Sequence, residues 1–200
     1  MNSDTINWAA RHDPICSKIY KGCICSDELP PLTDNSAWII NLNPRNSEIS
    51  DNSHWVYLRT YSKKHKQYYA VDYLCSGGGN IHDSHFIANT VLAYSSNVYN
   101  LPFPLQSAKN EVTNCGSYSL LFLLLNSRGL TGKYISKFFF TEGKEPTVAR
   151  DIMVCHIVYT LFDIKGISFL STISDRSFLK KVKIAQKQAK KKKRKSINKQ

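Results

Sequence analysis

The chain has 200 residues, of which 42% are hydrophobic and 12% aromatic. This is enough for one globular domain with a substantial core, and it excludes a largely disordered chain. The net charge of +12 is uneven, because residues 180–200 hold 11 of the 27 Lys and Arg residues and no acid, which leaves 16 basic and 15 acidic residues elsewhere. We therefore expect one nearly neutral domain over residues 1–178 and a basic, disordered tail over residues 179–200.

Taken in chain order, the sequence predicts an α+β domain. Residues 1–35 mix helix-capable and turn-rich sequence. Apolar and aromatic segments predict strands at residues 37–42, 54–61 and 67–74, with the last two joined as a hairpin through the basic turn at residues 63–66. The glycine-rich residues 76–80 predict a loop, and two prolines exclude a helix from residues 101–106. Helices are expected at residues 84–96, 117–126, 132–140 and 148–162.

The segment VTNCGSYSLLFLLL places Cys115 and Gly116 at the mouth of a strongly apolar helix. A helix N-terminus and a nearby imidazolium both lower the pKa of a thiol and make it a better nucleophile. Gly116 would leave room for the backbone of a substrate. Taken alone, however, an Asn-Cys-Gly tripeptide more often contains a buried structural cysteine.

A nucleophilic thiol needs a base, and His54 has the distinctive setting of opening a predicted strand just before Trp55. Asp72 lies in the adjacent strand of the hairpin, isolated among apolar residues, and could orient the imidazole. A buried carboxylate needs such a compensating partner. Asp83, in a loop, is the fallback acid. Gln106 follows the proline-containing segment and could donate its side-chain amide to an oxyanion.

The order His54-Trp55, Asp72, Gln106 and Cys115-Gly116 resembles clan CE of the cysteine proteases, which includes the adenovirus and SUMO proteases. The segments YKGCICSDELP, WIINLNP and SHWVYL are similar to the virion maturation proteases of virophages, Polintons and adenoviruses, and the resemblance covers about residues 18–125. It implies a small mixed sheet packed against a central buried helix that carries the nucleophile, with a papain-like site in rearranged chain order. It also implies His54 as general base, Asp72 as its orienter, Cys115 as nucleophile and Gln106 as oxyanion donor.

Two features depart from the pattern of the clan. Adenovirus proteases usually have Glu where this chain has Asp72, whereas SUMO proteases have Asp. Gln106 lies further from Cys115 than is usual, which leaves Asn110 and Asn114 as alternative oxyanion donors.

The resemblance implies a cysteine endopeptidase that processes viral capsid or core proteins during virion maturation, through thiolate attack and an acyl-enzyme. An alternative within the clan is a deconjugating protease for ubiquitin-like proteins, which Asp72 favours. A non-enzymatic, basic DNA-binding protein on a degenerate protease fold is a third reading, and the intact His, Asp and Cys set argues against it. The chemistry requires no cofactor and no metal.

The tail from Lys180 to Lys199 predicts non-specific DNA binding through counterion release, or a nuclear-localisation signal. DNA would then act as an activator or guide, as it does for adenovirus protease. The first residues lack the regions of a signal peptide, and the apolar run Leu120–Leu125 is too short to cross a bilayer. We expect an intracellular monomer without a membrane partner, present in the virion and in the host nucleus or viral factory.

In a reducing compartment the six cysteines should be free thiols. A zinc site formed by Cys16, Cys23, Cys25 and His12 is the less favoured reading, because their spacing fits no C-x₂-C pattern. Cys75 and Cys155 are expected to pack in the core, with a reactive surface thiol as the alternative for Cys75.

Overall fold

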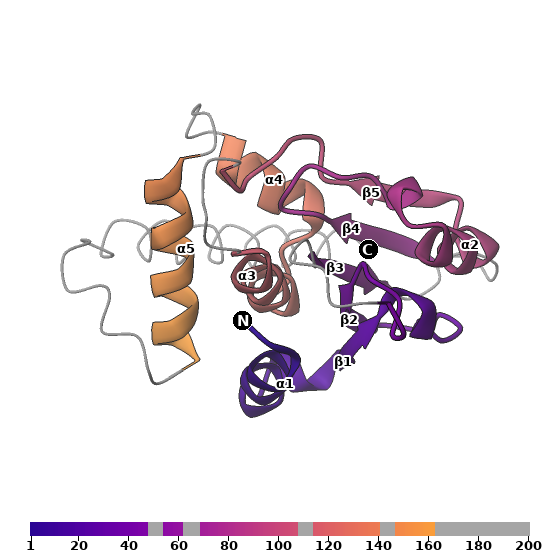
Figure 1. The fold of residues 1–200 in the computed structure, drawn as a ribbon, viewed down its shortest axis with the longest axis horizontal. Helices are drawn as coiled ribbons and strands as arrows, with labels where there is room; N and C mark the ends of the chain where they lie inside the picture. Colours follow the sequence, from indigo (N-terminus) through magenta and orange to yellow (C-terminus); the bar gives the residue numbers. More distant parts are fainter. Residues whose placement is uncertain (48–53, 62–68, 108–113, 141–146, 163–200) are drawn as a thin grey trace, which may run out of the picture.

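A computed structural model describes residues 1–47, 54–61, 69–107, 114–140 and 147–162. In this part of the chain a five-stranded sheet is flanked by helices (Figure 1), and its strand order follows the sequence, β1-β2-β3-β4-β5. The two outer pairs, β1–β2 and β4–β5, are parallel, whereas β2–β3 and β3–β4 are antiparallel. The predicted α+β class with a small mixed sheet is confirmed.

The strands are β1 (Tyr20–Cys25), β2 (Ala37–Asn41), β3 (Trp55–Thr60), β4 (Ala70–Leu74) and β5 (Asn97–Asn100). The helices are α1 (Ser3–His12), α2 (His85–Tyr94), α3 (Cys115–Ser127), α4 (Gly132–Phe140) and α5 (Val148–Leu161). Short 3₁₀ turns occur at η1 (Cys16–Lys18), η2 (Ser26–Glu28) and η3 (Ile81–Asp83).

The predicted strands correspond to β2, β3 and β4, and the predicted helices to α2, α3, α4 and α5. No strand was predicted at β1 or β5, the two edge strands. β1 contains Gly22 and a register shift between Tyr20 and Gly22, and β5 has only four residues, two of them Asn. Glycine and asparagine are depleted in strands, so neither segment carries a clear strand pattern.

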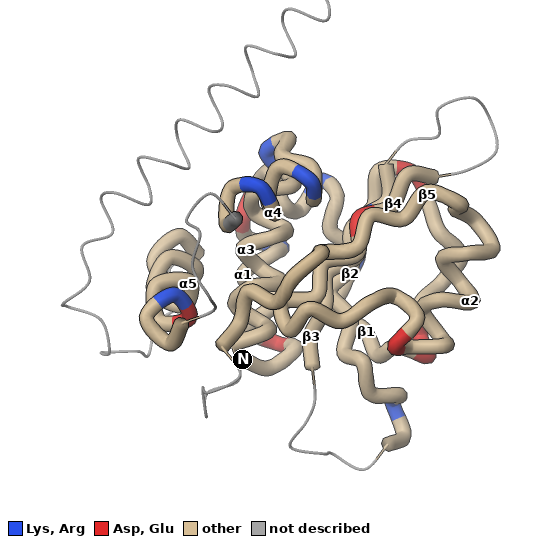
Figure 2. Tube along the Cα trace, turned by 90° about the horizontal axis from the view of Figure 1, so that it is seen from above, with Lys and Arg blue, Asp and Glu red and all other residues tan. Residues whose placement is uncertain are grey.

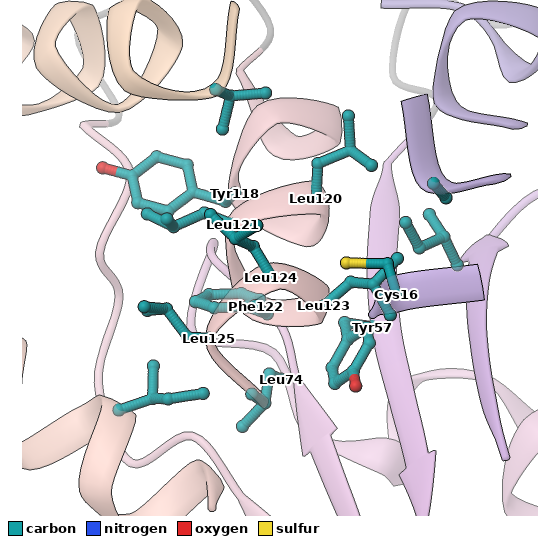
Figure 3. Close-up of a cluster of buried hydrophobic side chains, with 14 of the residues drawn as sticks. Cys16, Tyr57, Leu74, Tyr118, Leu120, Leu121, Phe122, Leu123, Leu124 and Leu125 are labelled. Atoms are coloured by element: carbon teal, nitrogen blue, oxygen red, sulfur yellow. The ribbon is translucent and has the colours of Figure 1, made fainter. Parts of the chain in front are cut away.

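α3 is the central helix of the domain, and every residue from Cys115 to Asn126 is buried. Its apolar side chains pack against Tyr57 and Leu74 from one face of the sheet (Figure 3), and further contacts come from α1, α4 and α5. A helix that is apolar on all sides must be buried by neighbouring elements on every side. The expectation of a central buried helix is therefore confirmed, and its first residue is Cys115.

The other face of the sheet forms a second core beneath α2. Side chains alternate along β3, so that Val56 and Leu58 point to the α2 face while Tyr57 points to α3. Ile87 and Val91 of α2 pack on the second face. Both faces of the central strands are therefore covered, which fixes β3 rigidly at the middle of the domain.

Several expectations lie outside the described residues: the basic turn at residues 63–66, the first residues of the 67–74 strand, Asn110, and the tail at residues 179–200. None of the helices in the described segments combines the length and apolar character needed to cross a membrane.

Candidate active site

Cys115 is the first residue of α3, and its side chain is 3% exposed. Burial raises the pKa of the thiol above its ordinary value of 9.0. The neighbouring backbone N–H groups of Trp55 and Gly116 oppose this rise. The start of the helix therefore offsets part of the effect of burial, and the net shift favours the neutral thiol.

His54 immediately precedes β3, and the next residue, Trp55, packs against the start of α3, where a Cβ atom placed on Gly116 would lie 3.5 Å from its Cδ1. The start of β3 and the start of α3 are therefore in contact. This agrees with the prediction that His54 and Cys115 lie close together. Burial lowers the pKa of the His54 imidazole from its ordinary value of 6.5, so the neutral form is favoured. A neutral imidazole is the form that accepts a proton.

Gly116 lies beneath larger side chains at this junction. A Cβ atom placed on Gly116 would be 3.1 Å from the Cβ of Met1 and 3.5 Å from Cδ1 of Trp55. The space beside Gly116, which we expected to accommodate a substrate backbone, is filled in this structure by side chains of Met1, Ile6 and Trp55, so the glycine permits close packing there.

The predicted contact between Asp72 and His54 is wrong. Asp72 pairs with Arg59 in the register of β3 and β4, and Arg59 is five residues further along the chain than His54. At about 3.3 Å per strand residue, the two positions are roughly 16 Å apart. The antiparallel pairing of β3 and β4 was predicted correctly, but its register brings the residue that follows β4 to the imidazole.

The compensating partners of Asp72 come from other elements. Its Oδ2 accepts hydrogen bonds from the Gly132 backbone N–H at 2.5 Å, from Asn126 Nδ2 at 3.4 Å and from the Tyr61 hydroxyl. Burial raises the pKa of Asp72, and these donors partly offset the rise. Asp72 therefore joins the sheet to the end of α3 and the start of α4, and it is part of the structural core.

Asp83, the fallback acid, does not take the place of Asp72. Its Oδ2 accepts the Asn80 backbone N–H at 2.6 Å and caps η3, while its side chain is exposed. The described residues contain no contact between Asp83 and the imidazole.

The group that contacts the imidazole is Cys75, whose Sγ lies 3.2 Å from Nε2 of His54. Cys75 follows β4 directly and is buried. From the sequence, Cys75 is predicted only as a packing residue or a surface thiol, because no local pattern sets it apart. Only the strand register could have identified it.

Gln106 lies in the segment beside Cys75. Its backbone N–H donates to the carbonyl oxygen of Ser76 at 2.9 Å, and its Oε1 accepts from the Ser76 hydroxyl at 3.1 Å. Because Oε1 accepts the hydrogen bond from the Ser76 hydroxyl, Nε2 is the remaining polar atom of the amide and can act only as a donor. No hydrogen bond from Nε2 to another described residue is present, and the role of Gln106 as oxyanion donor stays a prediction.

Hydrogen bonds to residues of α3 and α5 also hold the segment that contains Gln106. The Ser107 N–H donates to Oδ2 of the fully buried Asp151 at 3.1 Å, and the Tyr118 hydroxyl donates to Oδ1 of Asp151 at 2.8 Å. The same hydroxyl lies 3.1 Å from the Leu105 carbonyl oxygen. α3 and α5 thus hold this segment in place through a buried polar cluster that the sequence analysis did not anticipate.

Of the alternative oxyanion donors, Asn114 is the N-cap of α3, and its Oδ1 lies 3.1 Å from the sulfur of Cys155. Asn110 lies outside the described residues.

In the described part of the chain, no group of three or more His, Cys, Asp or Glu residues is arranged to hold a metal ion. Cys16, one of the candidate zinc ligands, lies 3.4 Å from the Ser127 hydroxyl at the far end of α3, and burial raises the pKa of its thiol to about 11. A fully buried neutral thiol is typical of a packing residue.

No protein-family model matches this sequence, and no curated protein matches it. Among solved structures, the crystal structure of the ASFV pS273R protease is similar over 75% of this chain and 63% of that protein, with 12% identity and a TM-score of 0.44. A selenomethionine structure of the same protease is similar over 66% of this chain and 45% of its own, with 13% identity and a TM-score of 0.36. The chain spans less than two thirds of that protease, and a likeness of this extent assigns neither family nor activity.

Proposed function

We propose that this protein is a cysteine endopeptidase in which Cys115 is the nucleophile and His54 the general base. The observation that carries the proposal is the position of Cys115 at the first residue of a buried helix whose start packs against Trp55, the residue that follows His54: a Cβ atom placed on Gly116 would lie 3.5 Å from Cδ1 of Trp55. The helix and the central strand are both fixed in the core, so they can hold a reacting sulfur and an imidazole in a constant geometry.

The pKa shifts favour a reaction that starts from a neutral thiol and a neutral imidazole. As the sulfur of Cys115 attacks the peptide carbonyl, its proton passes to His54, and the carbonyl oxygen becomes an oxyanion. Nε2 of Gln106 and the Cys115 N–H are the proposed donors to that oxyanion. Collapse of the intermediate expels the amine, which takes the proton from His54. Water then hydrolyses the thioester, again with His54 as base.

For the substrate, we propose viral capsid or core proteins that are cleaved during virion maturation. The support is the resemblance of the segments around β1, β2 and β3 to virion maturation proteases. The alternative, a deconjugase for ubiquitin-like proteins, was favoured by Asp72. That argument is lost because Asp72 pairs with Arg59 and not with His54.

The test uses the purified full-length protein and its Cys115→Ala variant on a proteome-derived peptide library, with new termini read by mass spectrometry. The same pair is tested on a ubiquitin-like protein fused to a reporter. Endoproteolysis by the wild type and none by the variant is the expected result. Cleavage confined to the fusion would favour deconjugation, and cleavage by the variant would exclude Cys115 as the nucleophile.

We further propose that the basic tail, residues 180–199, binds DNA without sequence preference and keeps the protease near packaged genome. In the described part of the chain, basic and acidic residues are both spread over several elements (Figure 2), whereas the tail holds 11 basic residues and no acid. A tail that neutralises about six phosphates should lose roughly a thousandfold in affinity between about 50 and about 200 mM salt. A salt titration with the full-length protein and a chain truncated after Phe178 tests this. Equal affinities would exclude the tail as the DNA site.

A further inference from the structure

His54 has a sulfur neighbour that the proposed mechanism does not use. Its Nε2 lies 3.2 Å from Sγ of Cys75, within the range of a hydrogen bond to sulfur. Both residues border the central strands, His54 just before β3 and Cys75 just after β4. The contact therefore joins two positions that the sheet itself holds in place.

The strand register accounts for this contact. Tyr57 pairs with Leu74 in the antiparallel ladder, so continuing the same register brings Cys75 and the loop after it alongside the start of β3. A Cβ atom placed on Gly77 would lie 3.5 Å from Cε1 and 3.6 Å from Nε2 of His54. The imidazole thus lies against the backbone of Gly77 while its Nε2 contacts Cys75.

The glycine-rich loop wraps around the sulfur of Cys75. A Cβ atom placed on Gly79 would lie 3.1 Å from this sulfur, and one placed on Gly77 would lie 3.8 Å from it. Burial raises the pKa of the thiol, and the backbone N–H groups of Gly79 and Gly77 oppose the rise. Gly78 has a φ of +82° and donates its N–H to the Cys75 carbonyl oxygen at 3.0 Å, which closes the loop. Left-handed backbone of this kind favours glycine. The loop that the sequence marks only as flexible is therefore shaped to hold one sulfur atom.

We propose that Cys75 is the positioning residue of the site: its sulfur accepts the hydrogen bond of the His54 Nε2–H, fixes the orientation and tautomer of the ring, and leaves Nδ1 as the base for Cys115. This inference rests on the proposed function. The tautomer of an imidazole is set by the hydrogen bond of the nitrogen that does not react, a task often performed by a carboxylate. Here a buried thiol occupies that position, and Asp72 is engaged elsewhere.

The competing assignment is that Cys75 is itself the nucleophile. Burial raises the pKa of both thiols, but the surroundings differ. Nearby backbone N–H groups oppose the rise at both sulfurs, and Asp83 raises the pKa of Cys75 further, whereas Cys115 is the first residue of α3, a position that favours a thiolate. The position at the start of a helix therefore favours Cys115 as the nucleophile, and we assign the sulfur of Cys75 as the acceptor.

The test compares Cys75→Ala, Cys75→Ser and Cys75→Asp in the full chain. Cys75→Ala should lower kcat by about 10-fold to 100-fold with little change in KM, because it removes the acceptor but not the base. Cys75→Ser keeps an acceptor and should retain most of the activity. Cys75→Asp should move the pH limb that reports His54 to higher pH, since a carboxylate stabilises the imidazolium. Cys16→Ala, which truncates a buried thiol at the other end of α3, is the matched control.

A second readout does not depend on proteolysis. In the Cys115→Ala background, long-range proton–nitrogen NMR of His54 should show a proton on Nε2, and Cys75→Ala should raise the population that carries it on Nδ1. Unchanged kcat, pH limb and tautomer in Cys75→Ala would overturn the proposal. Activity that survives in Cys115→Ala but is lost in both Cys75→Ala and Cys75→Ser would make Cys75 the nucleophile and overturn it as well. A wild type that cleaves nothing would refute the proposed function, and the NMR result would still decide the contact.

Discussion

Asp72 and Arg59 lie directly opposite each other in the ladder between β3 and β4, both almost fully buried. Arg59 donates from Nε to Asn126 Oδ1 at 3.0 Å, and Asn126 in turn donates to Asp72, so the two strands and the end of α3 share one polar network. Loss of an acceptor from such a network leaves its buried donors unpaired, at a cost in stability.

Replacement of Asp72 by Ala should therefore affect stability and not chemistry. It would leave the Tyr61 hydroxyl and the Gly132 N–H without their acceptor, at a cost on the order of 3 kcal/mol in the free energy of unfolding. Urea unfolding measures this cost, and kcat per folded molecule should stay close to that of the wild type. Asp34→Ala, at an exposed position, is the control. A strong loss of kcat in folded Asp72→Ala protein would restore a catalytic role for this carboxylate.

Cys115→Ala should abolish proteolysis with little change in unfolding temperature, because only one buried sulfur atom is removed. His54→Ala should lower kcat by about 10³-fold or more, since the buried thiol of Cys115 then lacks a base. Peptide cleavage and thermal unfolding, measured on the same preparations, separate the two effects. Full activity in either variant would show that the reacting pair lies elsewhere.

The pH dependence of kcat/KM follows from the two pKa shifts. Burial lowers the pKa of His54 below 6.5, so the neutral base persists to lower pH than usual, and activity should be lost only as pH falls through that lowered value. Burial raises the pKa of Cys115 above 9.0, so alkylation of this thiol by iodoacetamide should be slow at neutral pH and accelerate above about pH 9. Rapid, pH-independent alkylation between about pH 5 and 7 would indicate a resting thiolate–imidazolium pair and contradict the neutral mechanism.

Gln106→Ala should lower kcat by about 10²-fold to 10³-fold while leaving KM nearly unchanged, because an oxyanion forms only in the transition state. Ser76→Ala, which removes the hydroxyl that holds Oε1, should have a smaller effect in the same direction. Asn89→Ala, on the exposed side of α2, is the matched amide control. Wild-type kcat in Gln106→Ala would transfer the donor role to Asn110 or Asn114.

The sequence by itself determined the elements that build the site. The apolar run after Gly116 can be buried only as a core helix, and the alternating residues after His54 can be buried on both faces only as a central strand. These patterns are local, so they place Cys115 at the start of α3 and His54 at the start of β3 within a residue or two.

What only the tertiary structure decided is which side chain meets the imidazole. Asp72 and Cys75 are three residues apart and lie on opposite faces of β4, so the choice between them depends on the register of the β3–β4 hairpin. The sequence of residues 62–68, which join the two strands, contains no turn motif that would fix this register. The register is set by burial of Tyr57 and Leu74 against α3, a long-range contact, and a shift of one residue would move every side chain to the other face.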